Sequence, residues 1–466
     1  MNTTRVILTC ALKEYLASFR LLLGFIIVVF LMASGALIYS LRYQQEILEY
    51  RGVLADLDDR IRKESQSLAG VVTMGLEAYR RPSVLQFVVD GGEETLPNRI
   101  PYTVNLWMSP AREGGVNYML PPFEGLDWDF IVRVILSFVA IALTYDAVSG
   151  ERERGILRLI MANPVPRDKF LTGKLLAGLI ALCIPLLLGA LISVAILTLF
   201  GGIRLAGGDL IRLLIHLLTS AAYLSLFVLL GLIVSILARR SASSLVLLLL
   251  IWVCLVVAIP GMARPLATIA REIPSRQEFD DEVSQIFNDV LKEYEGKDVS
   301  HAPLNVAPID ESEFRWAEMM DKVDEREQEV VDHYWMMKMG QAAFARKIAM
   351  ISPAGLYQRA GQDLTNSGLV RQEEFARSVK TSREALASFG REMDAKDPAS
   401  PHILYRPWYM SQRPVDPDIV PRYREEVGGG GGKGLSQGLV GALWLLSEAL
   451  VLFVIAHVAF LRSDVR

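Results

Sequence analysis

The sequence has few cysteines and little net charge. Its three cysteines, in 466 residues, are Cys10, Cys183 and Cys254. All three lie in or beside apolar runs, so the sequence predicts neither a disulfide framework nor a zinc site. The formal net charge is only −4, and the basic residues occur in short clusters. This charge pattern excludes the strong positive field of nucleic-acid-binding domains, and we expect no nucleic-acid partner.

The sequence also lacks a pattern typical of enzyme chemistry. His301, His333 and His402 do not have the spacing of metal ligands. The glycine run at 428–434 resembles a phosphate loop only superficially, because Gly434 stands where that motif needs Ser or Thr. We therefore expect no catalytic residue, no metal ion and no cofactor on this chain.

Long apolar runs are abundant. Hydrophobic residues make up 52% of the chain, and the mean hydropathy is +0.32. Six runs have roughly the 20 residues that a helix needs to cross a bilayer. They lie near 21–41, 129–148, 174–200, 210–237, 244–262 and 438–461. The sequence therefore predicts an all-α polytopic membrane protein with six transmembrane helices.

The basic residues beside these runs predict the orientation. With six spans they fall on one side of the membrane, which the positive-inside rule identifies as the cytoplasm. They are Arg5, Lys13, Arg20, Arg152, Arg154, Arg158, Arg167, Lys169, Lys174, Arg239, Arg240, Arg462 and Arg466. Both termini are then cytoplasmic. The expected order is residues 1–41 (N-terminus and first span), 42–128 (extracytoplasmic), 129–148 (second span), 149–173 (cytoplasmic), 174–262 (third to fifth spans), 263–437 (extracytoplasmic) and 438–466 (sixth span and tail).

The first extracytoplasmic segment begins with a helical pattern. Apolar residues recur at spacings of three and four, which predicts that the first span continues outward as an amphipathic helix. These residues are Ile47, Tyr50, Leu54, Leu57, Ile61 and Leu68. Residues 84–89 run into Asp90 and two glycines, which predicts a short strand before a turn.

The second extracytoplasmic segment predicts a mainly helical domain. Residues 272–332 carry 19 acidic and 6 basic side chains, whereas 333–391 carry 4 acidic and 9 basic ones. Either helices from these two stretches pair their charges, or both present a solvated surface. Residues 400–427, rich in proline and aromatic residues, predict extended chain, and 428–432 predict a flexible hinge.

The cytoplasmic connection at 149–174 predicts a short amphipathic helix. Ile156, Leu159 and Ile160 have helical spacing, and Asn163 with Pro164 would end the helix. Such a helix either rests in the membrane interface as an anchor or acts as a lever on the two attached spans.

This connection resembles the signature of type 2 ABC exporter permeases. The matching residues are Glu151, Glu153, Gly155, Leu157, Ala162, Asn163, Pro164, Arg167, Gly173 and Lys174. Ile156 departs from the pattern, because the family usually has Thr there. The six spans, the large insertions after the first and fifth spans, and the stretch Ser352, Pro353 and Ala354 before a helix are similar to a subgroup of these permeases.

The resemblance implies a permease subunit in a bacterial inner membrane. It would work with a second permease copy or a homologous permease and with ABC ATPase subunits that bind ATP and Mg²⁺ on separate chains. The helix at 151–162 would be the coupling helix that docks on the ATPase. The residues expected to carry this coupling are Glu151, Glu153, Gly155, Ile156, Leu157, Arg158, Ile160, Asn163, Pro164, Arg167 and Lys174.

Two functions follow from this resemblance. The first is ATP-driven export of a substrate. The second is mechanotransmission, in which ATP hydrolysis moves the extracytoplasmic domain to regulate or assemble a partner, and membrane lipid is a further possible partner of that domain. Glu448, near the middle of the sixth span, is a candidate for either structural pairing or protonation, or else a transport role, because a carboxylate at that depth is costly.

Overall fold

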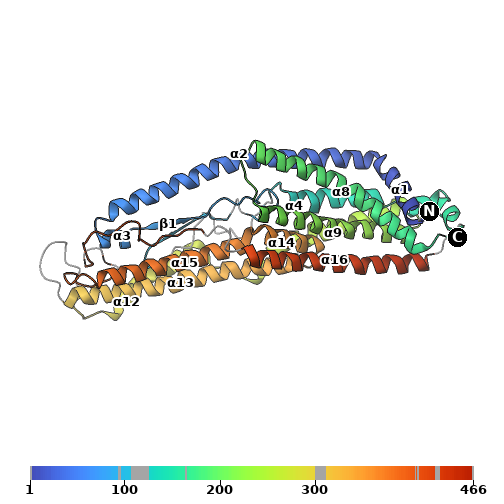
Figure 1. Cartoon of the computed structure of the whole chain (residues 1–466). Helices are drawn as coiled ribbons and strands as arrows, with labels where there is room; N and C mark the ends of the chain where they lie inside the picture. The colour runs from blue at the N-terminus through green and yellow to red at the C-terminus, as the bar shows by residue number, and fades with distance from the viewer. Residues whose placement is uncertain are drawn as a thin grey trace.

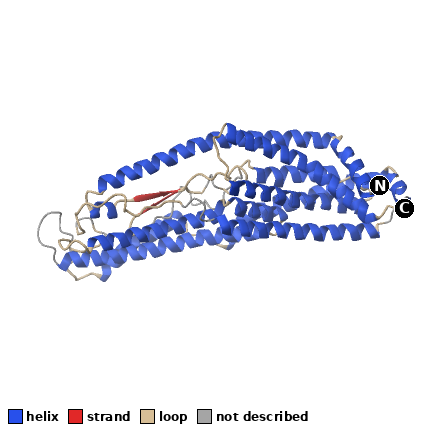
Figure 2. Cartoon of the chain, viewed as in Figure 1, coloured by secondary structure: helices blue, strands red, loops and turns tan. Residues whose placement is uncertain are grey.

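The computed structural model describes residues 3–92, 96–106, 125–162, 165–299, 311–404, 406, 409–425 and 431–463. The molecule is elongated, with a bundle of long helices at one end and a helical domain at the other (Figure 1). Both termini lie at the far end of the bundle. We call this end the terminal side, and the end of the bundle that carries the domain the domain side. Helices dominate, and the described residues contain one small sheet (Figure 2).

Six helical stretches are long and apolar enough to cross a membrane. The second and fifth are composites that include a π-helical segment. In chain order the stretches are α2 (Phe19–Glu64); α4 (Trp128–Phe130), η1 (Ile131–Leu136), α5 (Ser137–Thr144) and α6 (Ser149–Glu153); α8 (Arg167–Leu199); α9 (Gly207–Leu237); α10 (Ser241–Trp252), η2 (Val253–Ala258) and α11 (Ile259–Ala270); and α16 (Gly431–Arg462). The six predicted transmembrane helices are confirmed.

Helix α9 lies at the centre of the bundle. Its residues Tyr223, Leu224 and Phe227 are buried completely or almost so. Helix α10, by contrast, buries only Ser244 and Leu248. The exposed apolar face of α10 is the kind of surface that lipid tails or another membrane helix cover.

Helix α2 is 46 residues long and continues from the bundle into the domain. Its outer part buries Leu57 and Ile61 in the domain core, beside Leu68 at the start of the short helix α3 (Leu68–Thr73). The backbone N–H of Ser65 closes the last turn by donating to the Ile61 carbonyl at 2.9 Å. The predicted outward continuation of the first span is confirmed.

The small β element is present, but not where the sequence predicts it. Strand β1 (Leu76–Tyr79) pairs antiparallel with β2 (Arg99–Tyr102). The predicted strand at 84–89 is wrong, because most of these residues form turns. Val88 and Val89 are both buried against the bundle, so their apolar character serves packing on the membrane helices. Two consecutive buried residues also lack the alternation of a half-exposed strand.

Three long helices, together with the outer part of α2, form most of the domain (Figure 1). They are α12 (Arg276–Glu293), α13 (Glu311–Ala349) and α15 (Gly368–Asp394). The predicted pairing of acidic and basic stretches occurs where Lys380 Nζ lies 2.8 Å from Asp332 Oδ1. Other charged side chains of these stretches are partly or fully exposed and pair only within their own helix, such as Arg276 with Asp280 and Arg377 with Glu373, so both alternatives contribute.

Residues 409–425 cross the domain as extended chain, as the sequence predicts. Met410, Val415 and Tyr423 are buried in the domain core. The Val415 N–H donates to the Ser65 carbonyl at 2.9 Å and so fastens this segment to the end of α2. Of the predicted hinge, residues 428–430 lie outside the described residues, and α16 has already begun at residues 431 and 432.

Helix α14 (Pro353–Thr365) follows the domain helix α13 but packs in the bundle against α9 and α16. The Ser352 hydroxyl accepts a hydrogen bond from the Ala354 N–H at 3.0 Å, which starts the helix. The same hydroxyl donates to the Leu255 carbonyl of η2. Tyr357 is fully buried, and its ring stacks on that of Tyr223 with centroids 4.6 Å apart. Helix α14 therefore ties the domain to the central span.

Candidate coupling site

The connection between the second span and α8 contains two short helices on the terminal side. Helix α6 is followed by α7 (Ile156–Ala162). Gly155 separates them with φ +73°, a conformation that residues with a side chain rarely adopt. Its N–H donates to the Arg152 carbonyl at 3.1 Å and closes α6. The single coupling helix predicted for 151–162 is therefore corrected to two helices joined at a glycine.

Helix α7 has one buried face and one exposed face. Leu157 is fully buried in the bundle core, and Ile160 packs partly buried against the same core. On the opposite face, Leu159 is 71% exposed, and Ile156 and Arg158 are exposed beside it. An exposed leucine next to an arginine is a combination suited to contact with another protein.

A buried ion pair fixes α6 to α8. Lys174 Nζ lies 2.5 Å from Glu151 Oε1, and both side chains are less than a tenth exposed. Glu14, from the first helix α1 (Thr3–Leu16), is the outer neighbour, with its Oε2 3.9 Å from the same ammonium group. Two charged groups at this burial are stable only as partners, so Glu151 and Lys174 hold the segment in place.

A second set of contacts ties α6 to the turn between α9 and α10. The Arg152 guanidinium donates to the carbonyls of Ala238 at 2.8 Å and Ile236 at 3.0 Å. Glu153 accepts from the N–H of Ser241 at 2.8 Å and from its hydroxyl at 2.9 Å. Helix α6 thus contacts the third, fourth and fifth spans through polar bonds.

Arg167 joins the start of α8 to the end of α16. Its Nη1 donates to the carbonyl oxygens of Phe460 at 2.6 Å and Leu461 at 2.8 Å. A cation there satisfies carbonyls at the negative end of the helix. The rings of Phe170 and Phe460 stack beside this contact, 5.4 Å apart.

A cavity of about 420 Å³ lies between α1, α7 and α8. Its walls include apolar side chains such as Val6, Ile160 and Phe170 and the charged pair Glu151 and Lys174. Nearby, burial and the adjacent Glu14 raise the pKa of Tyr15, so its hydroxyl stays neutral.

The predicted coupling residues therefore separate into two groups. The first group is buried or bonded within the chain and comprises Glu151, Glu153, Leu157, Ile160, Arg167 and Lys174. The second comprises the hinge Gly155 and the exposed Ile156 and Arg158, to which the structure adds Leu159. Asn163 and Pro164 lie outside the described residues.

The sequence reasoning did not assign Arg152 a coupling role. Its partners are the backbone carbonyls of Ala238 and Ile236, more than 80 residues away. No sequence pattern marks such a partner, because every residue has a carbonyl group.

Glu448 lies apart from these residues, on α16. It is half-buried beside Leu445, which is fully buried in the stripe that packs α16 on the bundle. Within the described residues, Glu448 makes no hydrogen bond or ion pair. Among the described residues, no group of three His, Cys, Asp or Glu side chains is placed to hold a metal ion.

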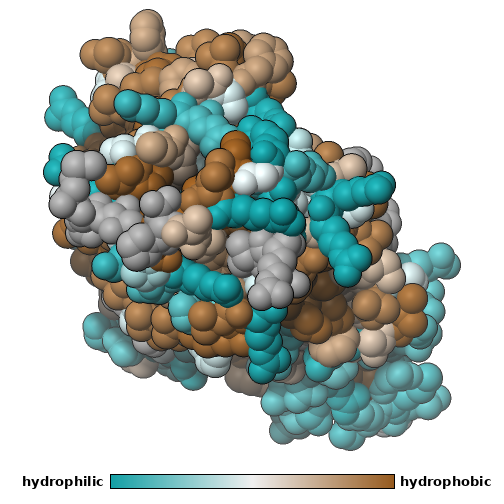
Figure 3. Space-filling view, turned by 90° about the vertical axis from the view of Figure 1, so that its right-hand side faces the viewer, coloured by the Kyte–Doolittle hydropathy of each residue, from teal (hydrophilic) through white to brown (hydrophobic). Residues whose placement is uncertain are grey.

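The terminal face combines hydrophilic and apolar surface. Figure 3 shows hydrophilic side chains across the middle of this face, with apolar side chains among and around them. A polar end on an apolar bundle is expected where membrane helices emerge into water.

Fold and site together define a multi-pass membrane protein with a glycine-hinged pair of short helices bound to several spans. The sequence profile of the ABC-2 family transporter proteins matches residues 8–465, nearly the whole chain. The chain belongs to this family.

Curated relatives support the assignment over a shorter stretch. A probable ABC transporter permease protein NosY of Pseudomonas aeruginosa is 30% identical over 83 residues, which are 18% of this chain and 30% of the relative. The corresponding protein of Stutzerimonas stutzeri is 28% identical over 94 residues, 20% of this chain and 34% of the relative. The matches span about a third of the length of each relative.

Proposed function

We propose that the chain is the permease subunit of an ATP-driven ABC exporter in a bacterial inner membrane. The terminal side faces the cytoplasm, and two permease chains work with two ATPase subunits that bind ATP and Mg²⁺. The substrate is exported toward the side that carries the domain. Family membership supports the permease role, and the basic residues of the terminal side support the orientation.

The observation that carries the proposal is the division of α6 and α7 into exposed and anchored residues. Ile156, Arg158 and Leu159 form an exposed surface that an ATPase subunit would contact. Leu157 is buried one residue from this surface, and Lys174 and Arg152 anchor the preceding α6. A push on α7 would therefore reach the bundle core directly through Leu157, and would reach α8, α9 and α10 through Gly155 and the anchored α6.

Mechanotransmission is the second candidate, and the length of α2 favours it. A single helix runs from Phe19 in the bundle to Glu64 in the domain without a break. A rotation or tilt of this helix in the membrane would move the domain directly. The domain would then regulate or assemble a partner on its side of the membrane, with no substrate crossing.

The test compares a charge introduced on α7 with charge reversals on and beside α7. The full chain is co-purified with the ATPase encoded beside it, and ATP hydrolysis is measured in nanodiscs. We expect Leu159→Asp and Arg158→Glu to weaken the association about tenfold or more, as loss of a central interface residue does. Lys169→Glu, an exposed reversal outside α6 and α7, is the matched control and should change little.

Two outcomes would contradict the coupling role. One is full association and unchanged ATP hydrolysis in both α7 variants. The other is an equal loss in Lys169→Glu, which would indicate a general charge effect.

Spin labels on α2 and the domain would separate export from mechanotransmission, because mechanotransmission requires ATP-dependent domain movement in the absence of any transported substrate.

A further inference from the structure

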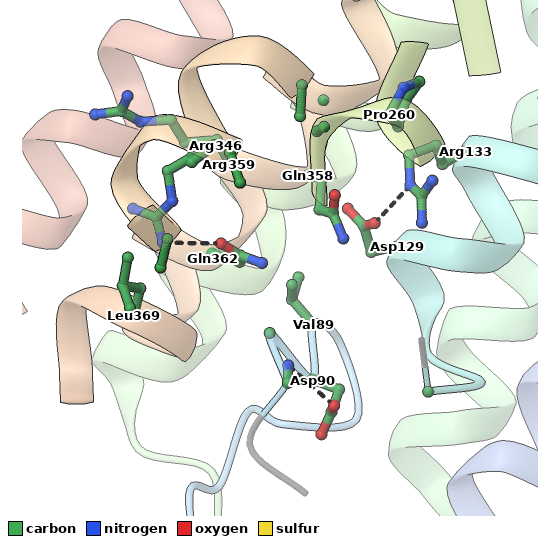
Figure 4. Close-up of a pocket in the computed structure, with 18 of the residues that line it drawn as sticks. Val89, Asp90, Asp129, Arg133, Pro260, Arg346, Gln358, Arg359, Gln362 and Leu369 are labelled. Carbon is green, nitrogen blue, oxygen red and sulfur yellow. Dashed lines mark hydrogen bonds and ion pairs between the residues drawn. The ribbon is translucent and has the colours of Figure 1, made fainter. Parts of the chain in front are cut away.

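A cavity of about 190 Å³, lined in part by charged and amide side chains, lies on the domain side, where the bundle meets the domain (Figure 4). Helices α11, α13 and α14 form one part of its wall, and the start of the second span with the loop at 89–92 forms another. The amides of Gln358 and Gln362 lie between these two parts. The coupling site is at the opposite end of the bundle, so this cavity is separate from it.

The wall formed by the second span is acidic. Asp90, Asp127 and Asp129 line it together with a single arginine, Arg133. Arg133 Nε lies 3.1 Å from Asp129 Oδ2, and both side chains are almost completely buried. Burial and the neighbouring Asp129 raise the pKa of Asp127, as expected where carboxylates are crowded together. A bound cation would relieve this crowding.

Asp90 is held in a fixed position. Gln86 Nε2 donates to its Oδ1 at 2.6 Å, and the Gly92 N–H donates to its Oδ2 at 3.1 Å. Its own N–H donates to Asp127 Oδ2 at 2.7 Å. The carboxylates of this wall are therefore preorganised before any ligand arrives.

The facing wall is basic. Arg346 of α13 donates to the neutral amide oxygen of Gln362 at 3.2 Å. Burial lowers the pKa of Arg346, which is the effect of an environment that solvates its charge poorly. Arg264 of α11 makes no side-chain bond to another described residue, whereas Arg359 lies 3.4 Å from Asp363. Asp363 also attracts the Arg346 guanidinium, although no carboxylate forms a close ion pair with it among the described residues. In the described part of the chain, Arg264 is therefore the guanidinium of this wall without a carboxylate partner, and Arg346 shares its nearest carboxylate with Arg359.

An apolar surface adjoins the basic wall on the same helix. Helix α11 contributes Pro260, Ala263 and Arg264 to the cavity and exposes Met262, Leu266 and Ile269 elsewhere. The apolar surface continues along the fifth span, where Val253 and Val257 are exposed. A charged cavity beside a lipid-accessible apolar stripe matches a molecule with a polar head and long apolar chains.

We propose that this cavity binds the headgroup of a phospholipid that carries a primary amine, as phosphatidylethanolamine does. The phosphate lies against Arg346 and Arg264, the ammonium group lies against the carboxylates of the acidic wall, and the acyl chains follow the exposed face of the fifth span. Guanidinium groups match phosphate oxygens, and a primary ammonium group donates three hydrogen bonds to carboxylates. A trimethylated amine donates none. This site goes beyond the proposed coupling function and does not depend on it.

The test measures lipid binding to the full chain without any ATPase. The protein is held in detergent micelles and titrated with acyl-labelled phosphatidylethanolamine, phosphatidylcholine or phosphatidylglycerol. Fluorescence anisotropy reports binding. We expect phosphatidylethanolamine to bind about tenfold more tightly than phosphatidylcholine, since only the former satisfies the acidic wall. Phosphatidylglycerol should bind more weakly too, because it has no amine.

Two charge variants and one filling variant locate the site. Arg346→Gln and Arg264→Gln should each weaken phosphatidylethanolamine binding severalfold to tenfold. Lys347→Gln, the next residue along α13 and exposed, is the matched control. Ala345→Leu fills the cavity with all charges kept, and it should also reduce binding. A thermal unfolding curve for each variant shows whether the fold is retained.

Several outcomes would overturn the assignment. Equal binding of the three lipids to the wild-type chain would show that the protein does not recognise the headgroup. Unchanged binding in Arg346→Gln and Ala345→Leu would place the lipid elsewhere. Soluble O-phosphoethanolamine competing as strongly as the lipid would indicate a free zwitterion as ligand. Leu159→Asp should leave lipid binding intact, so failure of the coupling proposal is distinguishable from failure of this one.

Discussion

The two ends of the bundle are joined to their neighbouring segments by different kinds of contact. On the terminal side, α6 is held by the Glu151–Lys174 ion pair and by bonds from Arg152 and Glu153 to a turn. On the domain side, α14 is held mainly by packing around the buried Tyr357. Polar bonds can be exchanged for water or a partner's groups, whereas a packed aromatic cannot. The bonds from Arg152 and Glu153 to the turn can therefore be exchanged when α6 moves, whereas the packed domain side transmits motion rigidly.

Close helix approach reinforces the packing on the domain side. A Cβ atom added to Gly441 of α16 would lie 2.7 Å from the Cβ of Ala360 in α14. Only glycine permits this contact, and small residues are the usual means by which membrane helices approach closely. The two helices can hardly slide past each other, so motion of α16 would carry α14 with it.

Tyr357→Ala should have the largest effect on stability. It removes a fully buried ring that stacks on Tyr223, and large aromatic-to-alanine changes in cores cost about 3 to 5 kcal/mol. Unfolding of the full chain in detergent, followed by circular dichroism, measures the change. Tyr357→Phe keeps the packing and is the control. A loss below about 1 kcal/mol in the alanine variant would show that the domain side is not held by packing.

Lys174→Met should have the next largest effect. It leaves Glu151 buried without its partner, and breaking a buried pair costs about 3 kcal/mol or somewhat more. The double exchange Glu151→Lys with Lys174→Glu should recover part of the loss, because it restores the pair in reverse. Equal unfolding temperatures for Lys174→Met and the wild-type chain would mean that this pair does not hold α6.

The same two ends differ in how much of their structure can be predicted from the sequence. The six spans, the outward continuation of α2 and the presence of short helices in the connection at 149–174 follow from hydropathy, helical spacing and a short motif. The burial of the Glu151–Lys174 pair does not follow from these patterns. Helical spacing identifies neighbours on one helix, but it does not identify the residues that they meet on another helix. The buried position of Tyr357 cannot be predicted from the sequence for the same reason, since its contacts in α9 are more than 130 residues away.

The misplaced strand has a different cause. Val88 and Val89 are apolar because they pack on the bundle, and a short apolar run cannot be told from a strand by composition alone. The division at Gly155 of the helix predicted for 151–162 could have been predicted from the glycine itself. Glycine inside a helical pattern is tolerated often enough, however, that the pattern of Ile156, Leu159 and Ile160 favoured one helix.

Two serines on α9 allow the terminal side and the domain side to be compared within one helix, and their replacement has the smallest expected effect. Ser220 lies on the domain side, with its hydroxyl 2.8 Å from that of Tyr357. Ser235 lies on the terminal side, and its hydroxyl accepts from the N–H groups of Val148 and Ser149, each at 3.0 Å. Replacing either by alanine should cost about 1 kcal/mol, the net worth of an ordinary hydrogen bond.

The two variants should differ in function more than in stability. Ser235→Ala frees the backbone at the start of α6, so under the proposed coupling role we expect it to lower ATP hydrolysis by the partner ATPase. Ser220→Ala should leave that stimulation unchanged, because the stacked ring of Tyr357 still fixes α14 to α9. Unfolding curves and ATP hydrolysis are measured on the same preparations. A larger functional loss in Ser220→Ala than in Ser235→Ala would reverse the assignment of the movable and rigid ends.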